Sequence, residues 1–585
     1  MSAKECVSGL ISVIVGATVA MPAVAASSTD DALEEVVVTA RKRDESFRDV
    51  PMTVNVFTEQ AIAAAGIQKP ADFIARVPNM TLVETQNAGN AFVVVRGVSQ
   101  ARNSEPSVAV LVDGVLETNP AEFNKELVDI QQIEVLKGPQ GALYGRNAIG
   151  GAIIIHTKDP GDTLEGSVRL GAGNGSSRRA QAAFGGPLGE SDEMKFRASF
   201  GYSETDGYLD NVYLNQKADP SRDLSARLRL IWKPSESFTG DLRFALDDLD
   251  TRALYFVIPR DVEANPFSSF STPPNANDVT SPIQLDNPGV NTRNLFTTSL
   301  KLDFQTAAGT LTSVTGYDTT RELLTGDAYD FRPAATSVFN ALLGTDLNQS
   351  QYLDLHTWSQ ELRLTSPTTG RFSWIAGAYY VHTRRFISTG NNVDTGAGVF
   401  PIYRNPRLSG SNPSATFLAD SQSNDAWAVF ADATYDLTPQ LQFDAALRYD
   451  EDQRQNTTDT PTAFLPDPSA VSGEVRAHTW SKLQPKATLR YKPADNVTLY
   501  TSWSRGFRSG GFNQTGVGAV ANANNVAGVN DLFNAEVADT VEGGAKAQSP
   551  EGRFSGGVSL YSTKSRNGYF FVFLAANSTQ NLGNL

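Results

Sequence analysis

The sequence predicts a large membrane β-barrel preceded by a smaller α+β domain, and three observations lead to this fold class. After residue 164, apolar and polar residues alternate over segments of about ten residues, as in strands with one face in lipid. Short turns alternate with long polar connections between these segments. No apolar run of about 18 residues follows the N-terminus, which excludes helical membrane spans.

The composition narrows the class of protein. The chain has 585 residues and a net charge of -15, so it is too long for a single soluble core. It has no basic stripe to meet phosphates, which argues against nucleic acid as a partner. The only cysteine is Cys6, in a segment that we expect to be removed. The mature chain would then have no disulfide and no cysteine metal site.

Residues 1–25 have the features of a signal peptide. Lys4 precedes an apolar stretch at residues 7–20, and Ala23-Val24-Ala25 follows as a peptidase site. An N-terminal anchor helix is the alternative, but the apolar stretch is short and is interrupted by Gly9 and Gly16. We therefore expect export from the cytoplasm.

Residues 26–49 contain a short run that favours a β-strand. Its members are Glu35, Val36, Val37, Val38, Thr39 and Ala40. Charged residues flank it, including Arg41-Lys42-Arg43, which we expect to be solvated. Such a run suits strand addition to the edge of a partner's sheet, where backbone hydrogen bonds supply affinity. A plain edge strand is the alternative.

Residues 50–160 predict a mixed domain of about 110 residues, large enough to fold alone. We expect helices at residues 59–65, ending at Gly66, and from residue 70 to residue 74. Apolar strands without clean alternation are expected at residues 54–57, 92–95, 108–112, 133–136 and 153–155. Such strands are typically covered on both faces.

A loop at residues 138–151 joins the last two of these strands. Its motif residues are Gly138, Pro139, Gly141, Tyr144, Gly145, Gly150 and Gly151. Glycines permit backbone conformations that other residues resist, so we expect a loop of set shape. The plain alternative is a turn-rich connection in an α/β domain. A phosphate-binding P-loop is disfavoured, because no Lys-Ser or Lys-Thr follows the glycines.

The string around this loop is long and specific. Residues 129–160 read DIQQIEVLKGPQGALYGRNAIGGAIIIHTKDP, and VVVRGV at 93–98 and VAVLVDGV at 108–115 precede it. These motifs closely resemble the plug-domain signature of TonB-dependent outer-membrane receptors, in the same order. The resemblance implies an α+β plug at residues 50–160, inside the lumen of a barrel formed by residues 161–585. It also implies that residues 35–40 are the TonB box, within a periplasmic segment at 26–49.

Four charged residues fall in motifs of this family. Arg96 and Arg146 lie beside glycines in plug motifs, and Glu536 and Glu542 lie in the barrel string NAEVADTVEGGAK. By resemblance, the arginines face carboxylates of the barrel wall and latch the plug in place. The plain alternative is a pair of solvated arginines. A buried ion pair adds little net stability, but losing one partner leaves a costly unpaired charge.

The barrel segments show the alternation most clearly at residues 226–232, 242–247, 296–304, 427–436 and 441–450. Trp232, Tyr435 and Tyr491 precede short turns, as in an aromatic girdle at one membrane interface. Long polar connections are expected at residues 259–293, 323–357, 387–424, 451–477 and 509–537. A soluble sandwich or propeller is the alternative, but such folds seldom combine ten-residue alternation with long loops at one end.

The strand count is lower than the resemblance implies. We count about 15 or 16 strands, against about 22 in barrels of this family. The final Leu585 is not the aromatic residue with which such barrels usually end. We therefore expect a chain truncated at its C-terminus, which could not close a barrel alone, because an open sheet edge is not tolerated in lipid.

The resemblance implies active uptake of a scarce ligand, and a ferric siderophore is the leading candidate. The energy would come from the proton-motive force, transmitted by the partner TonB. Alternatives are another nutrient (an oligosaccharide or cobalamin), a non-functional truncated receptor, a passive channel or an adhesin. We expect a monomer in outer-membrane lipid of a Gram-negative cell. Acidic loop residues such as Asp327 and Asp346 argue mildly against a strongly anionic ligand.

An enzyme is the remaining alternative. The four histidines are His156, His356, His382 and His478, and they show neither triad nor metal spacing. We therefore predict no catalytic residues, no cofactor and no metal site.

Overall fold

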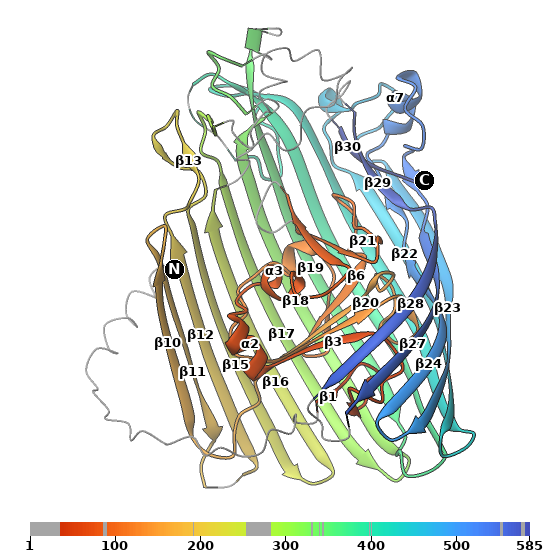
Figure 1. Ribbon diagram of the computed structural model, residues 1–585. Coiled ribbons are helices and arrows are strands. Elements are labelled where there is room, and N and C mark those ends of the chain that lie inside the picture. The colour runs from red at the N-terminus through yellow and green to blue at the C-terminus, as the bar shows by residue number, and fades with distance from the viewer. Residues whose placement is uncertain are drawn as a thin grey trace, which may run out of the picture.

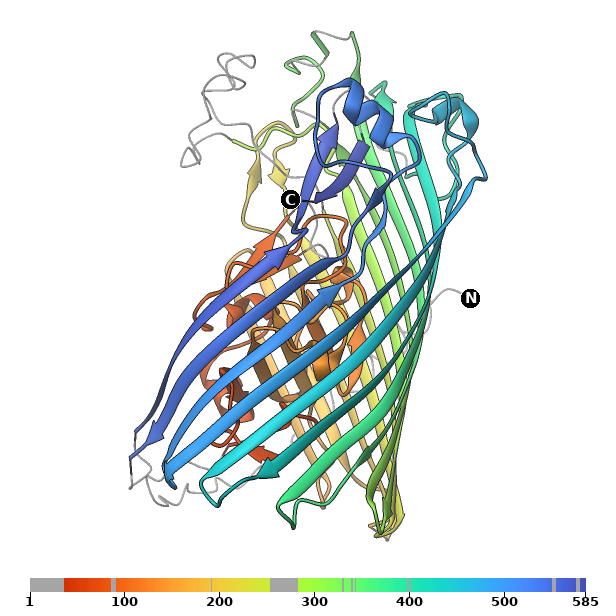
Figure 2. The same cartoon turned by 90° about the vertical axis from the view of Figure 1, so that its right-hand side faces the viewer.

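A computed structural model places the N-terminal domain within a curved, tilted sheet of long strands, as Figure 1 and Figure 2 show. It describes residues 36–85, 91–190, 192–252, 282–328, 331–337, 340–341, 344–396, 398, 401–549, 554–574 and 579–584. The predicted signal peptide and Glu35 lie outside the described residues. Short turns join the strands at one end of the sheet, the short-turn end, and longer connections join them at the other, the long-loop end (Figure 1).

The N-terminal domain, the plug, is built on a five-stranded sheet in the order β3-β8-β9-β6-β7. Only β6 and β9 pair in parallel. The elements of this part of the chain are β1 (Val37–Val38), β2 (Glu45–Ser46), β3 (Val54–Thr58), α2 (Glu59–Ala65), α3 (Pro70–Ile74), β4 (Met80–Glu84), β5 (Ala91–Val95), β6 (Val108–Val112), β7 (Val115–Glu117), the 3₁₀ helix η2 (Pro120–Glu122), β8 (Ile130–Lys137), α4 (Gly141–Tyr144) and β9 (Gly151–Thr157).

Local sequence accounts for the two longer plug helices. Thr58 caps α2 by accepting a hydrogen bond from the Ala61 amide at 3.3 Å, and Gly66 ends it in the left-handed region at φ 63°. Proline at the first position of α3 costs no hydrogen bond there. Both helices have the predicted bounds. They pack with Phe73, Ile133 and other apolar residues into one buried core on the sheet.

The long strands form one antiparallel sheet of 15 strands, in which each strand pairs with the next sheet strand along the chain. Its strands are β10 (Glu165–Gly173), β11 (Ser177–Pro187), β12 (Met194–Thr205), β15 (Ser221–Ser235), β16 (Phe238–Thr251), β17 (Val290–Thr306), β18 (Gly309–Asp327), β19 (Asp346–Thr365), β20 (Phe372–Asp394), β21 (Ser414–Asp436), β22 (Leu441–Thr458), β23 (Val475–Ala494), β24 (Val497–Arg508), β27 (Glu536–Gln548) and β28 (Ser555–Arg566). Within the described residues, β10 and β28 each pair on one side only.

Smaller elements lie outside this sheet. They are the hairpins β13 (Asp210–Asn211) with β14 (Gln216–Lys217), β25 (Gly511–Phe512) with β26 (Leu532–Phe533), and β29 (Tyr569–Leu574) with β30 (Thr579–Asn584), together with the helix α7 (Val517–Ala523) and the 3₁₀ helix η4 (Thr462–Phe464). None of the helices in the described part of the chain is long and apolar enough to span a membrane.

The predicted alternation separates an outer apolar face from an inner charged face. Along β22, Phe443 and Leu447 are exposed, whereas Asp444, Arg448 and Asp452 are buried. Successive side chains of a strand point to opposite faces, so the charged set faces the plug. The lumen is therefore lined with ionisable groups that the plug must satisfy. The prediction of a plug within a barrel-forming sheet is confirmed.

Three of the five predicted long connections, at residues 323–357, 387–424 and 451–477, are shorter than expected, because the neighbouring strands continue into them. The connection expected at 509–537 is confirmed, since β24 ends at Arg508 and β27 begins at Glu536, and that at 259–293 lies mostly outside the described residues. The connection expected at residues 323–357 shrinks to the stretch between Asp327, where β18 ends, and Asp346, where β19 begins. The same holds for β20 and β21, which continue to Asp394 and begin at Ser414. Near the long-loop end, polar residues occupy both faces, so the alternation fades although the backbone ladder persists.

Candidate functional site

The glycine loop at residues 138–151 packs closely against the barrel wall. A Cβ at Gly141 would lie 1.9 Å from Oε1 of Gln484, and one at Gly145 would lie 2.6 Å from Nη2 of Arg448. Gly145 also has φ 83°, and Gly138 has φ 82°. At Gly151, a Cβ would lie 2.2 Å from the Leu136 carbonyl oxygen. A side chain at Gly141 or Gly145 would meet the barrel wall, whereas one at Gly151 would meet the plug strand β8. Gly138 and Gly145 also have the positive φ that favours glycine.

The other motif residues of the loop make close contacts too. Pro139 packs on β24, where a Cβ at Gly506 would lie 3.1 Å from its Cβ, and Gly150 donates its amide to the Ser107 carbonyl at 2.8 Å. The Tyr144 hydroxyl donates to the carbonyl of Ala40 at 3.2 Å. This last contact ties the loop to the N-terminal segment.

The described residues of the predicted partner-binding segment, 36–40, are docked rather than projecting into solvent. Val37 and Val38 form β1, which pairs with β2, and Val38 and Ala40 are buried. The Thr39 amide donates to Oε1 of Glu134 at 2.8 Å, and its hydroxyl lies 3.0 Å from Nε2 of His156. Val37 is the exposed member, at 48%.

Arg41 and the side chain of Lys42 are buried and Arg43 is partly buried, so the prediction of a solvated flank is wrong. Arg41 lies 3.2 Å from Oδ2 of Asp444, and Lys42 donates to Glu361 at 2.6 Å. Burial lowers the pKa of Lys42 to about 8, although Glu361 acts in the opposite direction. The inward charges of the strands attract this segment into the lumen, which its local sequence does not reveal.

The first predicted arginine, Arg96, meets the predicted Glu542. Its Nη1 lies 2.5 Å from Oε2 of Glu542, and both side chains are buried. The other oxygen of Glu542 accepts hydrogen bonds from the hydroxyls of Thr53 at 2.7 Å and Tyr500 at 2.6 Å. The Arg96 guanidinium also lies over the ring of Tyr561 at 4.1 Å. This pair is enclosed by hydrogen-bonding and aromatic groups.

Arg146 meets a different barrel carboxylate from the predicted pair. Its Nη1 lies 2.7 Å from Oδ2 of Asp452, and Arg454 lies 2.6 Å from the same oxygen. Arg454 also contacts Oε1 of Glu105, a plug residue, at 2.7 Å. Burial alone would raise the pKa of Glu105, but Arg454 and Arg146 hold it below its ordinary value. Asp452 and Arg454 continue the alternate positions of β22 whose charged side chains point inward. This period of two is the sequence signal that could have predicted both residues as partners of the plug.

Glu536 forms an ion pair with Arg508 on the neighbouring β24 instead of meeting either predicted arginine. Arg508 is fully buried and donates to the plug carbonyls of Glu105 at 3.1 Å and Ser99 at 3.4 Å. Among the described residues, Glu536 is therefore linked to the plug through Arg508. The predicted direct contact is wrong for this residue because the register of β24 and β27 places the two charges opposite each other.

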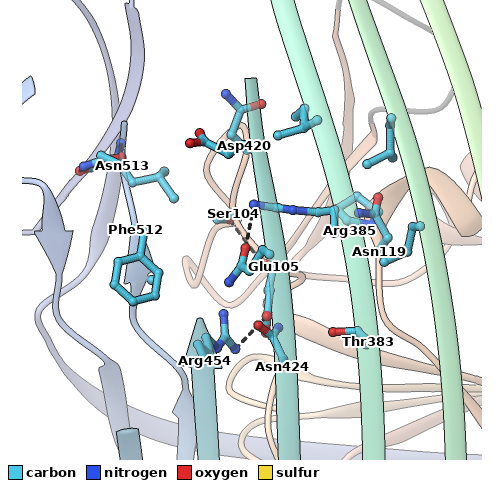
Figure 3. Close-up of a pocket in the computed structure, with 18 of the residues that line it drawn as sticks. Ser104, Glu105, Asn119, Thr383, Arg385, Asp420, Asn424, Arg454, Phe512 and Asn513 are labelled. Atoms are coloured by element: carbon cyan, nitrogen blue, oxygen red, sulfur yellow. Dashed lines mark hydrogen bonds and ion pairs between the residues drawn. The ribbon is translucent and has the colours of Figure 1, made fainter. Parts of the chain in front are cut away.

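A pocket of about 160 Å³ lies between the plug loops and the barrel wall, towards the long-loop end. Figure 3 shows Phe512 and Asn513 on one side of it and Arg385, Asn119 and Thr383 on the other. The charged residues that line it are Glu105, Arg146, Glu322, Arg385, Asp420 and Arg454. Arg385 donates to Gln422 at 2.7 Å, while its Nε is buried without a partner among the described residues.

A larger cavity of about 960 Å³ lies at the short-turn end, beside Arg96, Lys546 and Tyr561. One of its walls is β28, an edge of the sheet, so its size reflects that open side. The smaller pocket is the better candidate for a ligand site, because it lies towards the long-loop end and neither edge strand of the sheet lines it.

Comparisons with known proteins agree with this architecture. The model of the TonB-dependent receptor plug domain matches residues 46–152, and that of the TonB dependent receptor-like β-barrel matches residues 233–584. The chain belongs to the TonB-dependent receptors. Members of this family are receptors in the outer membrane of Gram-negative bacteria.

Individual relatives match the receptor over limited stretches. The pesticin receptor of Yersinia pestis is 36% identical over 176 residues, which are 29% of this chain and 25% of that protein. The vitamin B12 transporter BtuB of Vibrio vulnificus is 32% identical over 180 residues, 30% of this chain and 28% of that protein. The matched part thus spans about a quarter of the length of these curated relatives.

Solved structures resemble the receptor over most of its length. The ferric yersiniabactin uptake receptor FyuA from Yersinia pestis has a TM-score of 0.70 at 16% identity, covering 89% of this chain and 73% of that one. The siderophore receptor PiuA from Acinetobacter baumannii has a TM-score of 0.69 at 19% identity, covering 92% and 75%. At these identities the likeness shows the shared fold.

Proposed function

We propose that this receptor takes up a scarce small molecule, with a ferric siderophore as the first candidate, and that TonB supplies the energy from the proton-motive force. The observation that carries the proposal is the arrangement of two sites on opposite sides of the plug. The pocket faces the long-loop end, and the segment at residues 36–40 docks towards the short-turn end. A ligand arriving from outside would meet the pocket, and a periplasmic partner would meet the segment.

The pocket chemistry supports a ligand rich in oxygen acceptors. Arg146 and Arg454 are engaged by Asp452 and Glu105, whereas Arg385 has no carboxylate within 4 Å among the described residues. A guanidinium offers several donors in a fixed plane and suits carboxylate or chelating oxygen atoms. Phe512 and Tyr569 add aromatic surface to the wall. We infer a chelate or other polar ligand that accepts hydrogen bonds from Arg385.

The names of the structural neighbours favour iron among the possible cargoes. The two named above, FyuA and PiuA, are a ferric yersiniabactin receptor and a siderophore receptor. The curated relatives include a vitamin B12 transporter and a hemin receptor as well. Cobalamin and other nutrients therefore remain the alternative cargoes.

The residues at 36–40 are the proposed TonB-binding site. Strand addition needs a free backbone edge and β-prone residues, so β1 would have to leave β2 and the Thr39 hydrogen bonds to Glu134 before pairing. Val37, half exposed, is the residue that a partner strand would reach first. Arg96 with Glu542, and Arg146 with Asp452, are the proposed latch that holds the plug meanwhile.

Uptake of radiolabelled iron from a panel of ferric siderophores tests the proposal, in a host without other receptors for them. Val37→Pro removes a backbone donor, so we expect normal ligand binding and loss of uptake. Val37→Thr keeps a β-branched residue and should take up iron normally. Arg385→Gln should weaken binding itself by about tenfold, the loss of one charged hydrogen bond.

Two results would contradict the proposal. Uptake by Val37→Pro at the wild-type rate would exclude strand addition at this segment. Failure of every ferric siderophore to bind, with binding of cobalamin or a sugar instead, would exclude iron as the cargo.

A further inference from the structure

Four aspartates converge at the long-loop end of the sheet, outside the ligand pocket. Asp286 precedes β17, Asp327 ends β18, Asp346 begins β19 and Asp394 ends β20. Carboxylate oxygens of Asp286, Asp346 and Asp394 all lie within 4.8 Å of one another. Three separate connections therefore bring their charges to one point, which no spacing in the sequence indicates.

The strand register places two of these charges directly opposite each other. Asp346 and Asp394 are cross-strand partners between β19 and β20, and Asp327 is the partner of Asn348 between β18 and β19. Like charges placed opposite each other destabilise a sheet. Within the described residues, Asp286, Asp327 and Asp394 have no Lys, Arg or His within 4 Å to offset that repulsion.

Asp327 supplies an independent sign that a ligand belongs here. The residue is only 4% exposed, and its Oδ2 has no hydrogen-bond partner among the described residues. Its carboxyl group lies within hydrogen-bonding range of the Asp286 carboxyl group and of the Asn287 side chain. A buried carboxylate oxygen without a partner, facing another carboxylate, is costly unless a cation or a proton compensates it.

Two amides complete the surroundings. Nδ2 of Asn287 donates to Oδ2 of Asp394 at 2.6 Å and to Oδ1 of Asn348 at 2.7 Å. These bonds hold Asp394 and Asn348 in place, and an amide brings no positive charge to the carboxylate. The side-chain oxygens of Asn287 and Asn348 are also of the kind that bind hard cations.

We propose that Asp286, Asp327, Asp346 and Asp394 bind one Ca²⁺ ion. Ca²⁺ takes six to eight oxygen ligands in flexible geometry, which suits carboxylates from several loops and leaves positions for amide oxygens and water. Mg²⁺ demands a smaller, near-octahedral set. The proposal does not depend on the identity of the transported ligand.

The ion would brace one wall of the pocket. Gln351 on β19 and Thr389 on β20 are cross-strand partners that line the pocket, and they lie five residues along their strands from Asp346 and Asp394. Neutralising the aspartates would hold these strand ends together. Ca²⁺ thus shapes the entrance through which a ligand approaches.

Equilibrium dialysis with radioactive Ca²⁺ on the full chain, purified in detergent, tests this site. We expect one ion per chain with a dissociation constant on the order of 10⁻⁴ M, as for extracellular Ca²⁺ modules, and a higher melting temperature in Ca²⁺ than in chelator. Asp346→Asn should lose the ion and the shift.

Asp467→Asn is the matched control, since it removes one charge from an exposed connection at the same end. It should keep both the ion and the shift. Asp394→Asn serves as a second variant if Asp346→Asn does not fold. The proposal is wrong if the wild type shows no saturable binding at millimolar Ca²⁺, or if the two site variants bind as it does.

Discussion

Arg96 and Arg146 both belong to the plug and both meet a carboxylate of the barrel wall, but their surroundings differ. Arg96 and Glu542 form one pair, enclosed by Thr53, Tyr500 and Tyr561. Arg146 shares Asp452 with Arg454, at the edge of the pocket. If Arg96 is lost, no second arginine of the described residues replaces it beside Glu542. If Arg146 is lost, Arg454 still pairs with Asp452.

This difference indicates two roles, holding the plug and binding a ligand, which the sequence motifs do not distinguish. The Arg96 pair is shielded and complete, so its contribution lies in holding the plug. The Arg146 cluster has two cations and two anions, Glu105 being the second anion, and lies where a ligand would enter. A ligand that engages Arg146 or Arg454 would redistribute these pairs. Of these two arginines, we therefore expect Arg96 to contribute more to stability and Arg146 to contribute more to ligand binding.

The largest effect is expected for Arg96→Met, which leaves Glu542 buried and unpaired. The free energy of releasing the plug, measured by proteolysis in a urea series, should fall by about 3–5 kcal/mol. The double variant Arg96→Met with Glu542→Met should recover most of that loss, because no lone charge remains. A loss below about 0.5 kcal/mol for the single variant would show that the pair does not hold the plug.

A pH-dependent effect should come from Glu122, a plug residue that faces barrel Asp318 and accepts a hydrogen bond from Thr320 at 3.0 Å. Burial, with Asp318 and Glu117, raises the pKa of Glu122 to about 8 from an ordinary 4.5. Between these pH values the folded state holds a proton that the unfolded state has lost. Stability therefore falls as pH rises, by up to about 1.4 kcal/mol per pH unit.

Glu122→Gln should flatten this slope and be more stable than the wild type at pH 8. Urea titrations between pH 6 and pH 8 measure it. Glu59→Gln is the control, since Glu59 is a partly exposed plug carboxylate paired with Lys158, and the substitution should leave the slope unchanged. An unchanged slope in Glu122→Gln would assign the pH dependence to another group.

A smaller loss of stability, about 1–2 kcal/mol, is expected for Arg146→Met, because Arg454 keeps both Asp452 and Glu105. Ligand affinity should fall by tenfold or more in the same variant, as titration of the purified receptor would measure. If Arg146→Met instead destabilises the plug as much as Arg96→Met and leaves affinity intact, the two sites have the same role.

The smallest effect should come from an exposed pair on the sheet. Arg222 and Asp250 lie 3.3 Å apart with about half of each side chain exposed. Such pairs contribute little, so Arg222→Gln should change stability by less than about 0.5 kcal/mol. The same urea series measures it, and a loss as large as that of Arg146→Met would mean that burial does not explain the contrast.

Much of the fold could be predicted because its causes are local. The helices at Glu59–Ala65 and Pro70–Ile74 carry their own start and stop signals, and the apolar runs of the plug strands are short and plain. The inward charges of β22 follow from a period of two. The pairing of Arg96 with Glu542 came from family motifs, since no local pattern joins residues so far apart.

The sequence by itself determined the fold class, the glycine positions of the plug loop and the face on which charges lie, because backbone conformation and alternation act between near neighbours. Only the tertiary structure decided which charges meet: Arg146 with Asp452, Glu536 with Arg508, Lys42 with Glu361, and the four aspartates of the proposed Ca²⁺ site. Those pairings depend on strand register and on the orientation of the plug in the lumen. Because these side chains are buried, each charge pairs with the counter-charge that the register brings within reach.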